Sequence, residues 1–313
     1  MKERIVFALA LSAALPLVCT ATENLPQIPF AQTAIVPDEK QLIVTPWYAY
    51  SVFRKVWIGE AKTSIEIFPK DDFELNDGMV RLDYGLTERL ALDLNLGATS
   101  AATRAWNPRN VPQTTQGLID TQLGVRYRFL DGQTTNAPWY VPTLTGRVGG
   151  IIKGNYIINY PMAPGDGASG FELDLLMTKT TPWYGLGVYG NFGWRLFCNE
   201  VPETIFGSAG LSETLNFHWV ITSVSLFAGY RASHDLSGGD FSGPGLTSGS
   251  PYDYVVVGYR PTAQETYQLA EVGLGLSDKW GHSYFFSCSA AYDGRNTGKN
   301  SNFIIGMHWP LNL

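Results

Sequence analysis

Residues 80–97 read VRLDYGLTERLALDLNLG, and this stretch decides the fold. On both sides of residues 87–89 an apolar side chain occupies every second position, and the positions between them carry charged, amide or small side chains. A period of two places alternate side chains on opposite faces of an extended strand. Two such runs joined by a short connection predict a β-hairpin with one apolar face and one polar face.

The same alternation recurs along the rest of the chain, so the sequence predicts an all-β fold. The predicted strands cover residues 41–54, 78–86, 89–99, 116–130, 139–152, 170–180, 183–197, 208–217, 220–233, 265–277, 282–292 and 301–313. A further extended stretch, 65–68, is assigned to a loop, because an even strand count brings both termini to the same side of the membrane. The expected architecture is a transmembrane antiparallel up-and-down β-barrel of about twelve strands, with fourteen left open.

The first residues have the three-part pattern of a secretory signal peptide. Lys2 and Arg4 precede an apolar run, and small residues follow up to Ala21, after which cleavage is expected. We therefore expect a signal peptide over 1–21, a periplasmic segment over 22–40 that is either a tail or a lumen plug, and the barrel over 41–313. The expected location is the outer membrane of a Gram-negative cell, as a monomer surrounded by outer-membrane lipid.

Composition excludes several partners. The formal net charge is −6 and there is no basic run, which argues against nucleic acid as a partner. The four histidines lack the spacing of metal ligands, so neither a metal site nor a cofactor is expected. Cys198 and Cys288 remain after export and are too few and too far apart for a disulfide framework.

The connections between predicted strands alternate between short turns and long loops, which is typical of outer-membrane barrels with their short turns in the periplasm. Tryptophans gather at the predicted short-turn rim, where an amphipathic indole settles at the level of the lipid headgroups. This membrane-interface girdle is expected to contain Trp139, Trp183, Trp219, Trp280 and Trp309.

The last strand remains amphipathic up to Leu313, the final residue. A terminal strand of this kind resembles the signal that the outer-membrane assembly machinery reads, so that machinery is an expected partner during biogenesis. Such signals usually end in Phe or Trp, and Leu313 departs from that pattern.

The polar face of the predicted strands would line the lumen, because an Arg or Lys facing lipid at the midplane costs about 2–4 kcal/mol. Asp83 and Asp93 would lie nearly opposite each other, and two facing carboxylates repel unless a cation or a proton lies between them. Arg81 is the nearest candidate within the hairpin. We therefore predict a mixed-charge constriction that filters a small-molecule solute, although the same charges could simply hydrate and brace the interior. The predicted lumen-lining set is Arg81, Asp83, Asp93, Asp120, Arg126, Arg128, Arg147, Glu172, Asp174, Arg195 and Arg231.

Three motifs resemble a known family. The stretch YGLTERLAL at 84–92 is similar to the "YGLT-(D/E)-R-L-x-L" turn of the outer-membrane barrel family named after the MetA pathway of phenol degradation. LGVRYRFLD at 123–131 is similar to the family's "LGxKYRLLD", and TGRVGG at 145–150 is a degenerate form of its next strand. The resemblance implies a channel or transporter, with hydrophobic or aromatic compounds as candidate solutes, and it carries over no catalytic residue.

Two other functions stay open. A structural or adhesive barrel would act through its long outer loops, where Tyr252, Tyr254 and Tyr259 suit a contact surface. A lipid hydrolase would need a histidine beside a serine nucleophile on the outer face. None of the histidines has a convincing serine partner in the predicted layout, so we expect the chain not to be an enzyme.

Overall fold

The computed structural model describes most of the chain beyond residue 32. The described residues are 33–58, 61–64, 73–103, 114–132, 138, 140–156, 165, 167–181, 186–199, 201–217, 219–238, 264–295 and 297–313. They form an all-β structure with the strands β1 (Gln41–Ile58), β2 (Ala61–Ser64), β3 (Phe73–Gly85), β4 (Leu90–Thr103), β5 (Thr114–Leu118), β6 (Thr121–Leu130), β7 (Thr143–Ile152), β8 (Gly170–Thr180), β9 (Leu186–Phe197), β10 (Thr204–Asn216), β11 (Ile221–Asp235), β12 (Thr266–Asp278), β13 (Ser283–Arg295) and β14 (Gly298–Asn312). No helix in the described part of the chain is long and apolar enough to cross a membrane.

The sheet closes on itself into a barrel. Neighbouring strands pair antiparallel in sequence order, and β1 pairs with β14 from Gln41↔Asn312 to Val56↔Gly298. β5 and β6 both pair with β4 and occupy one position in the wall, while β2 is a short extension that, among the described strands, pairs only with β1. The wall therefore contains twelve strand positions, and the predicted architecture is confirmed.

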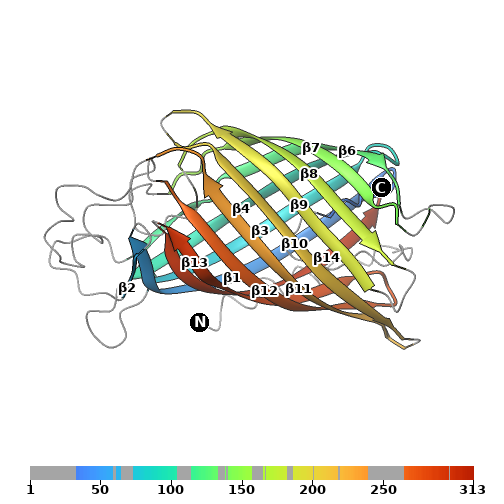
Figure 1. Ribbon diagram of the computed structural model, residues 1–313. Coiled ribbons are helices and arrows are strands. Elements are labelled where there is room, and N and C mark those ends of the chain that lie inside the picture. The colour runs from blue at the N-terminus through green and yellow to red at the C-terminus, as the bar shows by residue number, and fades with distance from the viewer. Residues whose placement is uncertain are drawn as a thin grey trace, which may run out of the picture.

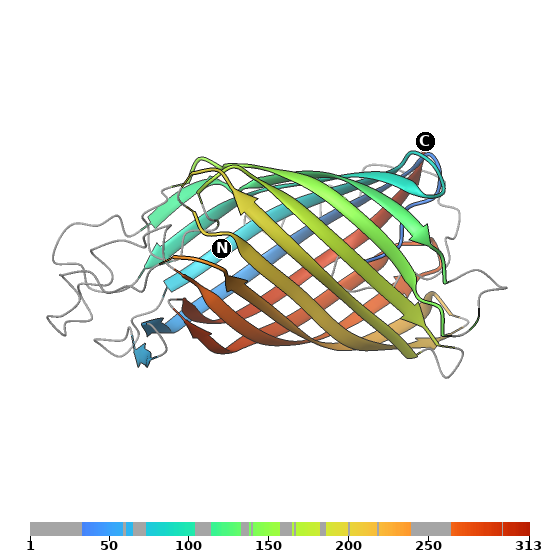
Figure 2. The ribbon, with the colours of Figure 1, turned by 45° about the horizontal axis from the view of Figure 1, so that its top comes forward.

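The strands are inclined to the barrel axis, as closure of a sheet requires (Figures 1 and 2). Gln41, Asn312 and the tight β3–β4 connection lie at one end, which we call the terminal rim. β2 lies at the opposite end, which we call the loop rim (Figure 1). The even number of wall strands brings the described start of β1 and the end of β14 to the same rim.

Side chains are sorted between the two faces as the alternation predicts. On β8, Phe171, Leu173 and Leu175 are exposed on the outside, whereas the intervening Glu172 and Asp174 are buried inside. An apolar exterior with a charged interior is the reverse of a water-soluble sandwich and is the pattern of a membrane barrel. The interior therefore holds the groups that could interact with a solute.

Several predicted boundaries were wrong at the loop rim. β10 begins at Thr204 rather than 208, and β14 begins at Gly298 rather than 301, because the added residues, TIFG at 204–207 and GKN at 298–300, continue the pairing without an apolar alternation. The strand predicted over 116–130 is interrupted at Ile119–Asp120. Cys198 and Cys288 are both free thiols. The predicted signal peptide, residues 22–32, the stretch 65–68 and the loop tyrosines lie outside the described residues.

Candidate functional site

Acidic and basic side chains gather on one side of the lumen at the height of the β3–β4 hairpin. Asp83 of β3 is directly opposite Asp93 of β4, as the three-residue turn predicts. On the strands that follow β4 in the wall, Arg126 of β6 is opposite Arg147 of β7, which is in turn opposite Asp174 of β8. Two carboxylates, two guanidinium groups and a further carboxylate thus project inward from five neighbouring strands.

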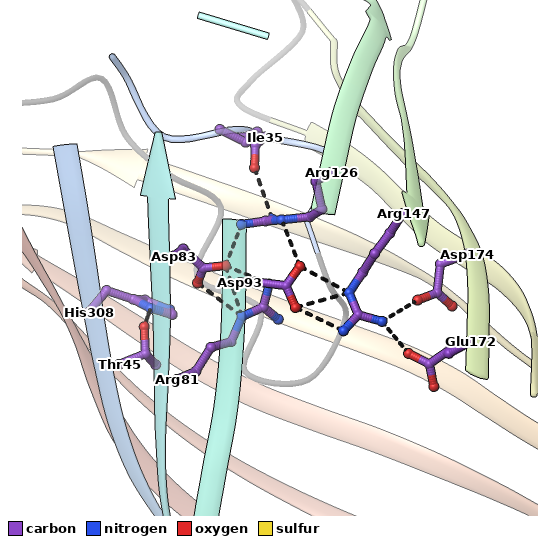
Figure 3. Close-up of polar contacts among 10 residues, drawn as sticks. All are labelled: Ile35, Thr45, Arg81, Asp83, Asp93, Arg126, Arg147, Glu172, Asp174 and His308. Carbon is purple, nitrogen blue, oxygen red and sulfur yellow. Dashed lines mark hydrogen bonds and ion pairs between the residues drawn. The ribbon is translucent and has the colours of Figure 1, made fainter. Parts of the chain in front are cut away.

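Arg126 separates the two facing carboxylates. Its Nη2 donates to Asp83, and its Nε lies 3.7 Å from Asp93 (Figure 3). Arg81 binds Asp83 from the other side, with Nε–Oδ distances of 2.9 and 3.1 Å. The cation that the sequence requires between these two aspartates is therefore contributed mainly by β6, while Arg81 binds only one of them.

Arg147 is the centre of the network. Its Nε and Nη2 bind Asp93 in a fork with distances of 2.8 to 3.0 Å, and its Nη1 donates to Glu172 and, at 3.2 Å, to Asp174 (Figure 3). Arg195 extends the chain of contacts to β9 by donating to Glu172. Four arginines and four carboxylates form this charge network, which we define as Arg81, Asp83, Asp93, Arg126, Arg147, Glu172, Asp174 and Arg195. Its formal charges balance, which is how a buried set of ions stays tolerable.

Two glycines make room for the central guanidinium. A Cβ on Gly124 would lie 2.7 Å from Nε of Arg147, and a Cβ on Gly149 would lie 2.8 Å from its Nη1. Both positions face the lumen, where any side chain would push Arg147 away from Asp93. An inward glycine beside an inward arginine is the one sequence signal that could have singled out Arg147, because glycine within a strand often marks a close approach.

The segment Thr33–Pro37, which we call the N-terminal strap, lies inside the barrel against this network. Thr145 donates its hydroxyl to the Ala34 carbonyl, the Ala34 N–H donates to Thr178, and Arg126 donates to the Ile35 carbonyl. Ala34 and Val36 are buried. Lys40 then adopts a φ of 62° in the turn that leads the chain from the lumen into β1. The described part of the N-terminal segment thus occupies the lumen near the terminal rim.

A cavity of about 340 Å³ opens in the lumen on the loop-rim side of the network. Arg81, Asp93 and Arg195 of the network form part of its wall, and Arg231 faces it from β11. Trp47, Phe206 and Tyr267 give it aromatic surface. The cavity therefore combines charged and apolar walls and ends at the charge network.

Three predicted lumen residues lie outside the network. Asp120, at the break between β5 and β6, accepts hydrogen bonds from the Tyr156 hydroxyl and the Gly154 N–H. Arg128 lies at the terminal rim, where it donates to the Glu88 carbonyl and pairs with Asp131 at 3.3 Å. Arg231 contacts Glu271 of β12 at 3.5 Å. The structure therefore places Arg128 apart from the constriction to which the sequence assigned it, because a period of two gives the face of a residue but not its height in the barrel.

The described tryptophans of the predicted girdle lie at the terminal rim. Trp219 and Trp280 are in the β10–β11 and β12–β13 turns and are exposed, and Trp309 of β14 pairs with Val44 of β1 near the same end. Trp139 and Trp183 lie outside the described residues.

The described histidines have no serine partner. His234 and His308 hydrogen-bond to threonine hydroxyls, at 2.8 Å to Thr266 and 2.9 Å to Thr45 respectively. His282 contacts Asp278 at 3.0 Å. Within the described residues, no group of three or more His, Cys, Asp or Glu side chains is arranged to hold a metal ion. The hydrolase geometry considered from the sequence is not assembled by these three histidines.

One solved structure agrees with the fold over nearly the whole chain, and others match at lower TM-scores. An outer membrane channel from Pseudomonas putida F1 superposes with a TM-score of 0.60 at 14% sequence identity, covering 92% of this chain and 100% of that one. The translocator domain of the autotransporter NalP from Neisseria meningitidis matches with a TM-score of 0.45, 13% identity and coverages of 98% and 94%. The toluene transporter TodX from Pseudomonas putida matches with 0.42, 8% identity and coverages of 95% and 96%. No family model and no curated protein matches the sequence, so the resemblance to the family named after MetA stays an expectation.

Proposed function

We propose that this chain is a passive outer-membrane channel for a small solute. The terminal rim faces the periplasm, the lumen cavity receives the solute, and the charge network together with the N-terminal strap forms a closed constriction below it. The observation that supports this most strongly is the cavity of about 340 Å³ inside a barrel with an apolar exterior. The likeness in fold to an outer membrane channel is in keeping with it.

The constriction is closed by hydrogen bonds to the N-terminal strap, which can break while the strands of the barrel stay paired. The strap is held by the three hydrogen bonds of Thr145, Thr178 and Arg126, each worth about 0.5–3 kcal/mol, depending on whether the donor is charged. Brief release of the strap would open the terminal end of the lumen while the strands stay paired. We therefore expect short, infrequent openings rather than the steady conductance of a wide porin.

Locking the strap tests this directly. The test uses a background in which Cys198→Ser and Cys288→Ser remove the native thiols. Ala34→Cys and Thr178→Cys then introduce two thiols at neighbouring positions, since the Ala34 N–H lies 3.2 Å from the Thr178 hydroxyl. In planar bilayers the oxidised pair should abolish openings and reduction should restore them. The same background without the pair, treated with the same oxidant, is the control.

Two outcomes would count against the proposal. Equal conductance of the oxidised and reduced pair would show that the strap is not in the path of the solute. If the wild type and a variant lacking residues 33–37 both fail to conduct and also fail to admit small solutes into liposomes, the channel function is wrong. The adhesive alternative would then be tested by deleting residues 241–260, which should abolish partner binding.

A further inference from the structure

Three guanidinium groups line the lumen cavity: those of Arg81 and Arg195, which belong to the charge network, and that of Arg231, which lies outside it. The side chains of Arg81, Arg195 and Arg231 are 21%, 28% and 25% exposed, and all three line the cavity. Their carboxylate partners lie behind them in the wall: Asp83 is 10% exposed, Glu172 1% and Glu271 4%. A solute in the cavity therefore meets the positive ends of three ion pairs that come from three different strands.

Two carboxylates also line the cavity, but both are already engaged. Asp93 is bound by the fork of Arg147 and its side chain is 3% exposed. Asp120 accepts the Tyr156 hydroxyl at 2.9 Å and the Gly154 N–H at 2.8 Å. Carboxylate oxygens with their lone pairs occupied offer little to an incoming cation, whereas a guanidinium carries five donors and can keep one partner while it binds another.

Apolar walls complete the cavity. Trp47, Met79, Phe206 and Tyr267 line it together with the arginines. The Arg195 guanidinium stacks over Phe206, with its carbon 4.3 Å from the ring centroid, so a cation and aromatic surface lie side by side in this wall. At about 340 Å³, the volume lies at the lower end of the range of small-molecule sites.

We propose that the cavity binds a small organic anion with a flat apolar body, of the aromatic carboxylate class. The carboxylate would take donors from the cavity-facing guanidinium groups, a geometry that arginine satisfies with two parallel N–H bonds. The ring would cover the aromatic wall, which a compact anion such as acetate would leave hydrated. This inference rests on the proposed channel function, because it names the class of solute that the channel holds.

Equilibrium binding to the purified, folded barrel in detergent tests the inference without any measurement of conductance. Isothermal titration calorimetry would use three probes: benzoate, the neutral benzyl alcohol, and acetate. Benzoate should bind at least about tenfold more tightly than either of the other two, since each lacks one of the two kinds of contact. Benzyl alcohol binding as tightly as benzoate would refute the anion site, and acetate binding as tightly would refute the apolar one.

Variants then assign the site. Arg231→Gln should weaken benzoate binding by at least about fivefold, through loss of one charged donor. Glu271→Gln keeps the guanidinium and removes its partner, so binding should be unchanged or tighter. Arg128→Gln, at the terminal rim, is the matched control and should have no effect. Undiminished binding in Arg231→Gln, or weakened binding in Glu271→Gln, would overturn the assignment.

The two proposals can fail separately. Benzoate binding without conductance would refute the channel and leave the anion site standing, whereas conductance without benzoate binding would refute only the anion site. Folding of each variant is checked by the difference in gel mobility before and after boiling. If Arg231→Gln does not fold, Arg231→Lys replaces it, because lysine keeps the charge but lacks the planar guanidinium. The Arg231→Lys variant should bind benzoate more weakly than the wild type does, but more tightly than the variant itself binds acetate. Any other order of these affinities contradicts the assignment.

Discussion

Replacing Arg147 with methionine is the sharpest test of the charge network, because methionine keeps an unbranched chain and removes only the guanidinium. The substitution removes five hydrogen bonds to three carboxylates. A sum over these bonds would overstate the effect, since Asp93 keeps a contact with Arg126 and Glu172 keeps one with Arg195. Asp174 loses the guanidinium that binds it directly. Removing one member of a buried ion pair costs about 3–5 kcal/mol, and we expect a loss of unfolding free energy in this range.

Urea unfolding of the barrel reconstituted in lipid vesicles, followed by tryptophan fluorescence, would measure this loss. The matched control is Arg128→Met, whose ion pair with Asp131 lies at the rim with both side chains about one-fifth to one-quarter exposed. A pair exposed in this way contributes about 0–1 kcal/mol. A second variant, Arg147→Met with Asp174→Asn, should recover part of the loss because it no longer buries that uncompensated charge. If Arg147→Met were no more destabilising than Arg128→Met, the network would not brace the barrel.

Three further predictions follow from single contacts. Gly149→Ala places a Cβ 2.8 Å from Nη1 of Arg147 and should lower the free energy of unfolding by about 1–3 kcal/mol in the same assay. Gly150→Ala, whose Cβ would have its nearest neighbour at 4.0 Å, should be nearly neutral, and equal effects of the two variants would show that Gly149 does not make room for Arg147. Thr145→Val removes one hydrogen bond from the strap, worth about 0.5–1.5 kcal/mol, and should raise the open probability in planar bilayers roughly two- to tenfold; an unchanged open probability would contradict strap gating. Tyr156→Phe removes the hydroxyl that both Asp120 and the Gly167 N–H contact, and should speed protease cleavage within residues 153–169 severalfold; unchanged cleavage would show that this hydroxyl does not hold the loop.

The fold was predictable because the alternation of side chains in each strand is a local property. Leu82 and Leu92 point to lipid and Asp83 and Asp93 point to the lumen, and the three-residue turn between their strands fixes the opposition of the two aspartates. The sequence therefore predicted an all-β barrel of about twelve strands, with fourteen left open, and the face of the strand on which Asp83 and Asp93 lie. These statements need only a period and the length of a turn.

The assembly of the site was not predictable, since it depends on registers between strands that long connections separate. Arg126 reaches Asp83 through the pairing of β6 with β4, and the register of that pairing, which ends at Asn95↔Gln122, is set across a long connection rather than a tight turn. A register shift between Arg128 and Leu130 further sets how β6 meets β7. The strap could not be placed either, because residues 33–37 carry no alternation, and their position depends on contacts with three distant strands.

Bracing and selecting need not be separate roles for the lumen charges. The network is electrically balanced, and its most deeply buried arginines, Arg126 and Arg147, are each 2% exposed, so they can stabilise the wall but cannot touch a solute. Arg81 and Arg195 keep a carboxylate on one side and reach the cavity with the other. Exposure therefore divides one network into an inner part that is enclosed in the barrel and an outer part that lines the cavity. Substitutions of the first kind should change stability more than binding, and substitutions of the second kind should change binding more than stability.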